Sequence, residues 1–417
     1  MNPTPFFAFL GGLLALAFVA NRLYRLTRIP DVILLMIVGL ALGPILGWIK
    51  AAEFEPITHI LGTLALILIL FEGGLELNLR DTLQRFPGGV LLSVLSFGFS
   101  MGFVTLVAWR SRLFSLSSGL LVGAVVGCVS STVVLPVLQQ IRVSPPVRLT
   151  LVIDASLSDI LGVLTVGILL DFGSGHGLSV AGFLAGAFSK LVLSIAIAVL
   201  TGILWARLLP VLSEQRFWQA LTFSVLVLLY ACAQSLSHGG LVAVLAFGLT
   251  LANARYVRPL LFEIMPPLPS GRPERHLEIL SFHSELGFLV RSFFFILLGV
   301  IVRLERLRGY ALLAIGVIGA LVVARWAAVK ASSWSWGEAN RKAKEIALWI
   351  FPRGLITAVL AIQVIEARGS EFDFLPALAF AIILVTNLLV VVASVRAGPG
   401  DMSPAPEVAP QRSVNIA

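Results

Sequence analysis

Apolar runs of about twenty residues recur along almost the whole chain, and they constrain the fold more than any other feature of the sequence. A helix of that length and composition is long enough to cross the hydrocarbon core of a bilayer. Only 12% of the 417 residues are charged, which is about half the share found in soluble domains. We therefore expect an all-α polytopic membrane protein.

Thirteen apolar runs can be placed, so we expect about thirteen transmembrane helices. They cover residues 5–21, 29–49, 59–77, 87–109, 115–138, 146–171, 178–209, 216–236, 239–253, 282–303, 309–330, 342–366 and 372–396. No polar stretch between them is long enough for a separate soluble domain, so residues 1–396 are expected to form one transmembrane domain. Residues 397–417 are rich in Pro, Ser and Ala, which predicts a short disordered tail.

Basic residues are distributed unevenly between alternate loops, and this asymmetry predicts the orientation of the chain. The richer loops carry clusters such as Arg22, Arg25 and Arg28, whereas the opposite loops carry fewer basic residues. By the positive-inside rule the richer loops face the cytoplasm. We expect a multi-pass protein of the cell (inner) membrane with its N-terminus outside and its C-terminus inside. The basic residues behind the net charge of +8 then serve as topology signals. We expect the lipid bilayer as a partner and no nucleic acid.

Two of the runs are interrupted by polar residues and proline. The fifth contains VSSTVVLP at 129–136 and the twelfth contains FPRGL at 351–355. They are seven spans apart, the separation expected if six-span units before and after a linking seventh span are inverted repeats. Broken helices at matching positions of two halves mark the midplane site of a transporter. The sequence therefore predicts inverted repeats with two interrupted helices that cross at the midplane.

The sixth run carries two aspartates, Asp154 and Asp159, in LVIDASLSDILGVLTVG. An aspartate at the centre of a membrane helix costs about 3 kcal/mol on insertion scales, so it is by default a functional residue. Residues five apart on an α-helix point about 140° away from each other. We therefore expect different roles for the two carboxylates. Ser156 shares the face of Asp159, whereas Ser158 shares the face of Asp154.

Arg353 lies within the twelfth run, where a cation must find an anion or reach water. We predict a structural ion pair between Asp154 and Arg353 that fixes the sixth helix against the interrupted twelfth. The alternative is that Arg353 lies near the cytoplasmic end of its helix and extends to the membrane interface. Either acid could also be paired with an arginine for packing alone.

The interruption in the fifth run contains three hydroxyl residues, Ser130, Ser131 and Thr132. A dehydrated monovalent cation must recover its hydration shell from neutral oxygens as well as from a carboxylate. Thr132 is the first choice as such a ligand. Ser130 and Ser131 are accessory candidates, with helix packing as the alternative reading.

Three further charged residues lie in apolar sequence and could support the site. Glu72 in the third run is a candidate gate or supporting acid, with an interfacial role as the alternative. Glu285 and Arg291 in the tenth run are six residues apart and point in different directions. They are expected to find partners on other helices, mainly for structural reasons.

Six motifs together resemble the monovalent cation:proton antiporters of the sodium/hydrogen exchanger superfamily, close to the prokaryotic NhaP type. They are RIPDVILLMIVGLALGP, LFEGGLELNLRD, SSTVVLPVL, DASLSD, FFFILLG and FPRGLITAVLA, in the family's order along the membrane domain. Each motif alone is weak, but the ordered set is specific.

The resemblance implies roles for individual residues. Asp159 corresponds to the aspartate that binds the ion and the proton, and Thr132 and Ser156 lie near that ion. Asp154 stands where the family has an acid that pairs with the arginine corresponding to Arg353. Ser158, which we include among the ion-site candidates, replaces a common asparagine of the electroneutral branch. Val133 stands where exchangers often have an aspartate, a feature similar to the potassium-efflux branch.

These observations predict a secondary active antiporter that exchanges a monovalent cation, most simply Na⁺, for H⁺ by alternating access, with a role in pH homeostasis. The resemblance implies electroneutral exchange and a homodimer. We expect no enzyme activity and no cofactor beyond the transported ions. A K⁺/H⁺ antiporter of the potassium-efflux type is the alternative on the same fold, as is a channel or an organic-solute symporter.

An intramembrane aspartyl protease is the alternative from a different class, because paired membrane aspartates also define that chemistry. It needs two carboxyl groups that share a proton. Here both aspartates lie on one helix and no Gly-x-Gly-Asp is present, so the pattern favours the antiporter.

Overall fold

The computed structural model describes residues 3–27, 29–49, 51–76, 87–141, 143–172, 180–212, 215–237, 239–254, 273–336 and 341–397. These residues form helices and no β-strand. Eight helical segments are long and apolar enough to cross a membrane, and shorter apolar helices occupy other predicted spans. The expected all-α polytopic fold is confirmed. The predicted tail falls almost wholly outside the described residues and stays a prediction.

Each predicted apolar run coincides with a described helix or with two consecutive helices. The first seven runs correspond to α1 (Pro3–Thr27), α2 (Asp31–Leu40) with the π-helical η1 (Ala41–Ile45), α3 (Ala51–Glu76), α5 (Pro87–Arg110), α6 (Leu116–Gly127) with α7 (Ser131–Gln140), α8 (Pro145–Phe172) and α9 (Val180–Leu212). The remaining runs correspond to α10 (Trp218–Ser237), α11 (Gly240–Ala252), α13 (Pro273–Ile301), α15 (Ala311–Ser332), α16 (Arg341–Trp349) with α17 (Leu355–Arg368), and α18 (Leu375–Ala397).

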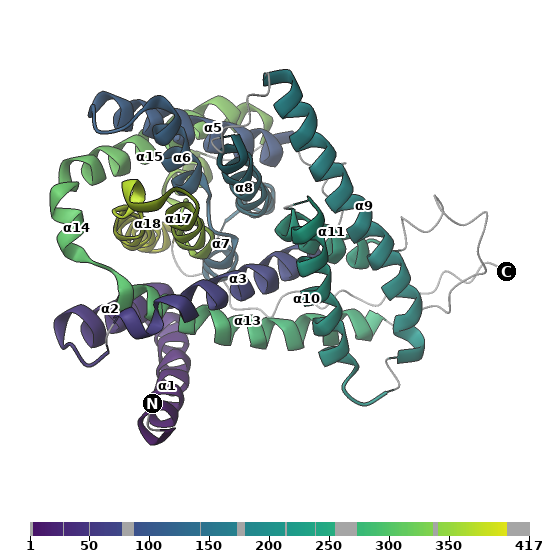
Figure 1. Cartoon of the computed structure of the whole chain (residues 1–417). Helices are drawn as coiled ribbons and strands as arrows, with labels where there is room; N and C mark the ends of the chain where they lie inside the picture. Colours follow the sequence, from purple (N-terminus) through teal and green to yellow (C-terminus); the bar gives the residue numbers. More distant parts are fainter. Residues whose placement is uncertain are drawn as a thin grey trace.

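The helices pack mainly within two groups (Figure 1). One group consists of α5, α6, α7, α8, α15, α16, α17 and α18, and we call it the site bundle. The other, which we call the second group, consists of α1, α2, α3, α10, α11 and α13, with α9 packed against α10 and α11. The short helix α14 (Leu304–Gly309) links α13 to α15. In Figure 1, α3 and α13 run across the middle of the molecule, and the site bundle lies above them.

The site bundle is built twice from the same order of elements, namely one long helix, one broken helix and another long helix. The first copy is α5, α6 with α7, and α8; the second is α15, α16 with α17, and α18. Each span of the second copy comes seven spans after its counterpart, an odd number, so the two copies enter the bilayer from opposite sides. This arrangement matches the predicted inverted repeats.

Both helix breaks fall where the sequence places its interruptions. Cys128 and Ser130 have extended backbone angles after α6 ends. Pro352 disfavours helical angles at Phe351, the residue before it, which helps to keep the chain out of helix after α16 ends at Trp349. The two breaks touch, because the Ser130 amide donates to the Pro352 carbonyl at 2.8 Å. A Cβ added at Gly354 would lie only 2.2 Å from the Ser130 hydroxyl oxygen, so glycine is needed for this crossing.

Close glycine contacts hold the second group together and bring it against the site bundle. A Cβ at Gly248 of α11 would lie 2.5 Å from the Phe71 carbonyl oxygen of α3. The two helix backbones can therefore come this close only because the residue at 248 has no side chain. A Cβ at Gly62 of α3 would lie 2.9 Å from Val359 of α17. The helix α3 therefore packs directly against the broken helix that borders the site.

Candidate ion-binding site

Asp159 is buried in α8, with 3% of its surface exposed, and faces the break in the fifth span. Its Oδ2 accepts hydrogen bonds from the Ser131 hydroxyl at 2.7 Å and from the Ser131 amide at 3.4 Å. Ser131 begins α7, so the carboxylate lies at the positive end of a helix dipole. Its other oxygen, Oδ1, has no hydrogen-bond partner among the described residues. One carboxylate oxygen is thus fixed while the other can still bind a ligand.

The three hydroxyl residues of the break differ in what they contact. Ser131, predicted as an accessory residue, makes the direct contact with Asp159. Thr132, the first choice from the sequence, shares a hydrogen bond of 3.0 Å with Ser130. Ser156 is half-buried one turn before Asp159 on the same helix. The structure therefore brings the candidates to one place but assigns the nearest hydroxyl to Ser131.

Ser158 stabilises the break and is not directed at the carboxylate. Its hydroxyl oxygen accepts from the Val129 amide at 2.9 Å, and its proton can be donated to the carbonyl of Ala155 or Val129. An amide freed at a broken helix needs such a partner in the bilayer. In the structure Ser158 therefore supports the broken helix, and its place in the ion site stays a prediction.

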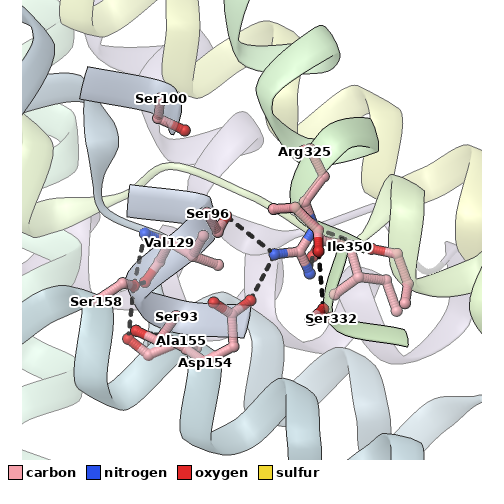
Figure 2. A network of polar contacts seen from close by, with 12 residues as sticks. Ser93, Ser96, Ser100, Val129, Asp154, Ala155, Ser158, Arg325, Ser332 and Ile350 are labelled. Carbon is pink, nitrogen blue, oxygen red and sulfur yellow. Dashed lines mark hydrogen bonds and ion pairs between the residues drawn. The ribbon is translucent and has the colours of Figure 1, made fainter. Parts of the chain in front are cut away.

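Asp154 forms its ion pair with Arg325 of α15, and the predicted pair with Arg353 is wrong (Figure 2). The Arg325 Nη1 atom donates to Asp154 Oδ2 at 2.5 Å and to the Ser96 hydroxyl at 3.3 Å. Both charged side chains are 1% exposed, so each charge compensates the other in a site buried away from solvent. The pair joins the sixth and eleventh spans, not the sixth and twelfth.

Arg325 was missed by the sequence reasoning, although the signal was present. It lies inside the apolar run 309–330, so the rule that singled out Arg353 applies to it equally. Its guanidinium also donates to the carbonyls of Ala347 at 3.0 Å and Ile350 at 2.9 Å, where α16 ends. Arg325 therefore both pairs with Asp154 and caps a broken helix.

Arg353 is 1% exposed, so it does not extend to an interface as the alternative reading required. Its Nη1 donates to the Cys128 carbonyl at 2.8 Å and its Nη2 to the Ser100 hydroxyl at 3.3 Å. Its own backbone is held by α18, since its amide donates to Thr386 and its carbonyl accepts from Asn387. The side chain finds freed backbone acceptors in place of the predicted carboxylate.

The two buried arginines, both from the second copy, donate to equivalent helix ends in the two repeats. Arg353 donates to the backbone carbonyl that follows α6, and Arg325 donates to carbonyls at the end of α16. A helix C-terminus is the negative end of its dipole and leaves carbonyls without partners. An arginine at the end of each of these helices both balances the negative end of the dipole and donates to the free carbonyls.

The predicted accessory residues lie away from these contacts. Glu72 accepts from the Ser284 hydroxyl at 2.6 Å, which links α3 to α13. Arg291 lies 3.8 Å from Asp31 of α2, so it does find a partner on another helix. Glu285 is exposed on α13. None of the three contacts Asp159.

The fully buried Asp and Arg residues of the described chain belong to the site bundle: Asp154, Asp159, Arg325 and Arg353. Their formal charges cancel when both aspartates are ionised. A proton or a monovalent cation bound at Asp159 would add one positive charge in either case, so the net charge of the site would be the same with either ligand.

Residues 12–399 match the family model described as "Sodium/hydrogen exchanger, transmembrane". The chain belongs to this family. It is a cation/proton antiporter and hence a secondary transporter, as the motifs predicted, and the protease reading is overturned. The multi-pass membrane character follows from the family and from the apolar helices.

Curated relatives and a solved structure agree with this assignment. The chain is 25% identical over 392 residues to the Na⁺/H⁺ antiporter 1 of Methanocaldococcus jannaschii, covering 88% of this chain and 85% of that protein. It is also 25% identical to the K⁺/H⁺ antiporter NhaP of Alkalimonas amylolytica, over 90% of this chain but only 63% of that protein. The structure of the sodium proton antiporter MjNhaP1 from M. jannaschii at pH 8 shares the fold, with a TM-score of 0.72, 22% identity and coverage of 95% and 96%.

Proposed function

We propose that Asp159 is the shared binding site for the proton and the transported monovalent cation. The observation that carries this proposal is the buried carboxylate with one oxygen held by Ser131 and the other without a partner among the described residues. An unpaired charge in a buried site is costly, so the carboxylate favours binding either ligand. Each ligand excludes the other because they compete for one oxygen.

Exchange is then one cation for one proton. Either ligand adds a single charge to a site whose four buried formal charges otherwise cancel, so the two loaded forms carry equal net charge. Replacing one ligand by the other on the opposite side moves no net charge. We therefore infer electroneutral antiport by alternating access, with the site bundle moving against the second group.

Na⁺ is the cation we propose first, with K⁺ as the alternative. The relatives support both, since one is named a Na⁺/H⁺ antiporter and another a K⁺/H⁺ antiporter. Size selection depends on how many neutral oxygens surround the ion.

The protein is further proposed to act as a homodimer in the inner membrane. Its N-terminus is proposed to lie outside, in line with the loop charges.

In proteoliposomes with an imposed pH gradient, we expect added Na⁺ to dissipate the gradient in a saturable manner, at a rate independent of membrane potential. Lowering the pH should raise the apparent KM for Na⁺, by up to about tenfold per pH unit, because protons occupy the same carboxylate. The measurement compares Na⁺, K⁺ and Li⁺ over a range of pH, each with and without a potential.

Protein-free liposomes are the control for leakage. Faster dissipation by K⁺ than by Na⁺ would replace the first cation by the alternative without moving the site. Rates that follow the membrane potential would contradict electroneutral exchange. A KM that does not change with pH would contradict competition for one carboxylate.

A further inference from the structure

Thr357 of α17 has a buried hydroxyl that lacks the hydrogen bond usual for a buried helical threonine. Buried helical threonines generally donate to the carbonyl four residues earlier, as Thr250 does to Ala246 at 2.6 Å and Thr386 to Ile382 at 2.7 Å. Thr357 is 1% exposed, and its hydroxyl has no hydrogen-bond partner. Among the described residues, the hydroxyls of Tyr24, Thr63 and Ser144 also lack a partner. Every other described serine or threonine that is buried as a whole residue has one.

The broken helix explains why Thr357 lacks the usual partner. The carbonyl four residues earlier belongs to Arg353, which precedes the start of α17 at Leu355. That carbonyl already accepts from the Asn387 side-chain amide at 2.8 Å. A buried hydroxyl without a partner loses the free energy of its hydrogen bond to water, so such a group calls for a partner from outside the chain, either a water molecule or an ion.

The contacts between α17 and α8 indicate where Thr357 lies relative to Asp159. A Cβ added at Gly162 of α8 would lie 3.8 Å from Leu360 of α17. Further along, the Arg368 side chain donates to the Leu169 carbonyl at 3.0 Å. The two helices therefore run side by side in the same direction.

Asp159 lies three residues before Gly162 on α8, and Thr357 lies three residues before Leu360 on α17. Residues three apart share a helix face and are separated by about 4.5 Å along the axis. The Asp159 carboxylate and the Thr357 hydroxyl consequently lie one turn from the same contact, on the same side of it. Both carry an oxygen without a partner among the described residues.

We propose that the Thr357 hydroxyl is a further ligand of the cation bound at Asp159, and that it helps to determine which alkali cation is accepted. This inference rests on the proposed function of Asp159. A hydroxyl oxygen is the neutral donor that a dehydrated Na⁺ or K⁺ requires beside a carboxylate. The ligand set then comes from both broken helices, α7 through Ser131 and α17 through Thr357.

The test compares Thr357→Ser with Thr357→Ala, because these variants differ only by the hydroxyl group. In proteoliposomes we expect Thr357→Ala to raise the apparent KM of the preferred cation by about tenfold and to change the order of Na⁺, K⁺ and Li⁺. Thr357→Ser should keep both properties close to those of the wild type. Thr250→Val is the matched control, since it removes a buried hydroxyl that already has its partner in α11.

A purely structural role for Thr357 would lower the maximal rate equally for all cations and leave their KM values unchanged, which would overturn the inference. Equal KM values in the Ser and Ala variants would overturn it as well. Asp159→Asn separates this inference from the proposed function. If that variant is inactive while Thr357→Ala transports like the wild type, only the role of Thr357 is lost. If Asp159→Asn transports normally, the shared site itself is refuted.

Discussion

Asp159→Asn is expected to reduce cation-dependent proton exchange to the rate of protein-free vesicles while the protein stays folded. The asparagine amide has nearly the same shape and can still accept the hydrogen bond that Ser131 donates to the carboxylate. It cannot bind a proton at the pH of the assay, and it brings no negative charge to a cation. Both half-reactions of the exchange should therefore fail together.

The measurement is pH-gradient dissipation in proteoliposomes, with the melting temperature of the purified variant as the check on folding. Asp373→Asn is the matched control, because its carboxylate is partly exposed and lies 3.4 Å from Arg306 at the surface of the site bundle. That variant should retain exchange. Wild-type exchange by Asp159→Asn would remove the carboxylate from the mechanism.

Breaking the pair between Asp154 and Arg325 is expected to destabilise the protein by about 3 to 5 kcal/mol, because either single substitution leaves a buried charge without its partner. Arg325→Met should be the more damaging of the two. It also removes the hydrogen bonds to Ala347 and Ile350 that cap α16. The loss is seen as a lower melting temperature and a lower yield of folded protein.

The double variant Asp154→Asn with Arg325→Met tests whether the two residues act as a pair. Since it removes both charges, it should be more stable than the sum of the single changes predicts. Arg306→Ala, which disrupts a partly exposed ion pair, should cost less than about 1 kcal/mol. Strictly additive effects at Asp154 and Arg325 would contradict the pairing.

Much of the fold could be predicted because its signals are local. The length of an apolar run is enough to predict a span, and proline with glycine at 351–355 marks the second broken helix. Asp159 could be singled out because a carboxylate in an apolar helix is costly wherever that helix lies. None of these inferences requires knowledge of which helices are neighbours.

The pairing of the buried charges could not be predicted in this way. Two arginines, Arg325 and Arg353, lie in apolar sequence, and the choice between them depends on which helix faces Asp154. Arg353 is satisfied largely by the Cys128 carbonyl, an acceptor that exists only because α6 ends there. Backbone groups freed by a break do not appear in a list of charged residues.

The same limit applies to the hydroxyl ligands. Ser131 and Thr132 are adjacent, and which of them reaches Asp159 depends on where α7 begins. Thr357 has an unsatisfied hydroxyl because α17 begins two residues before it. A shift of a helix boundary by one residue would change both contacts, and sequence patterns do not fix boundaries to that accuracy.

Proton release on cation binding tests the shared site most directly. Purified protein in weakly buffered detergent solution is titrated with NaCl, or with KCl if K⁺ proves to be the substrate, while the pH is recorded. Choline chloride is the control for ionic strength. Near the pH at which Asp159 is half protonated, we predict that cation binding releases protons from wild-type protein and from Asp373→Asn, with no release from Asp159→Asn. Undiminished release from Asp159→Asn, or cation binding by the wild type without proton release at any pH, would contradict it.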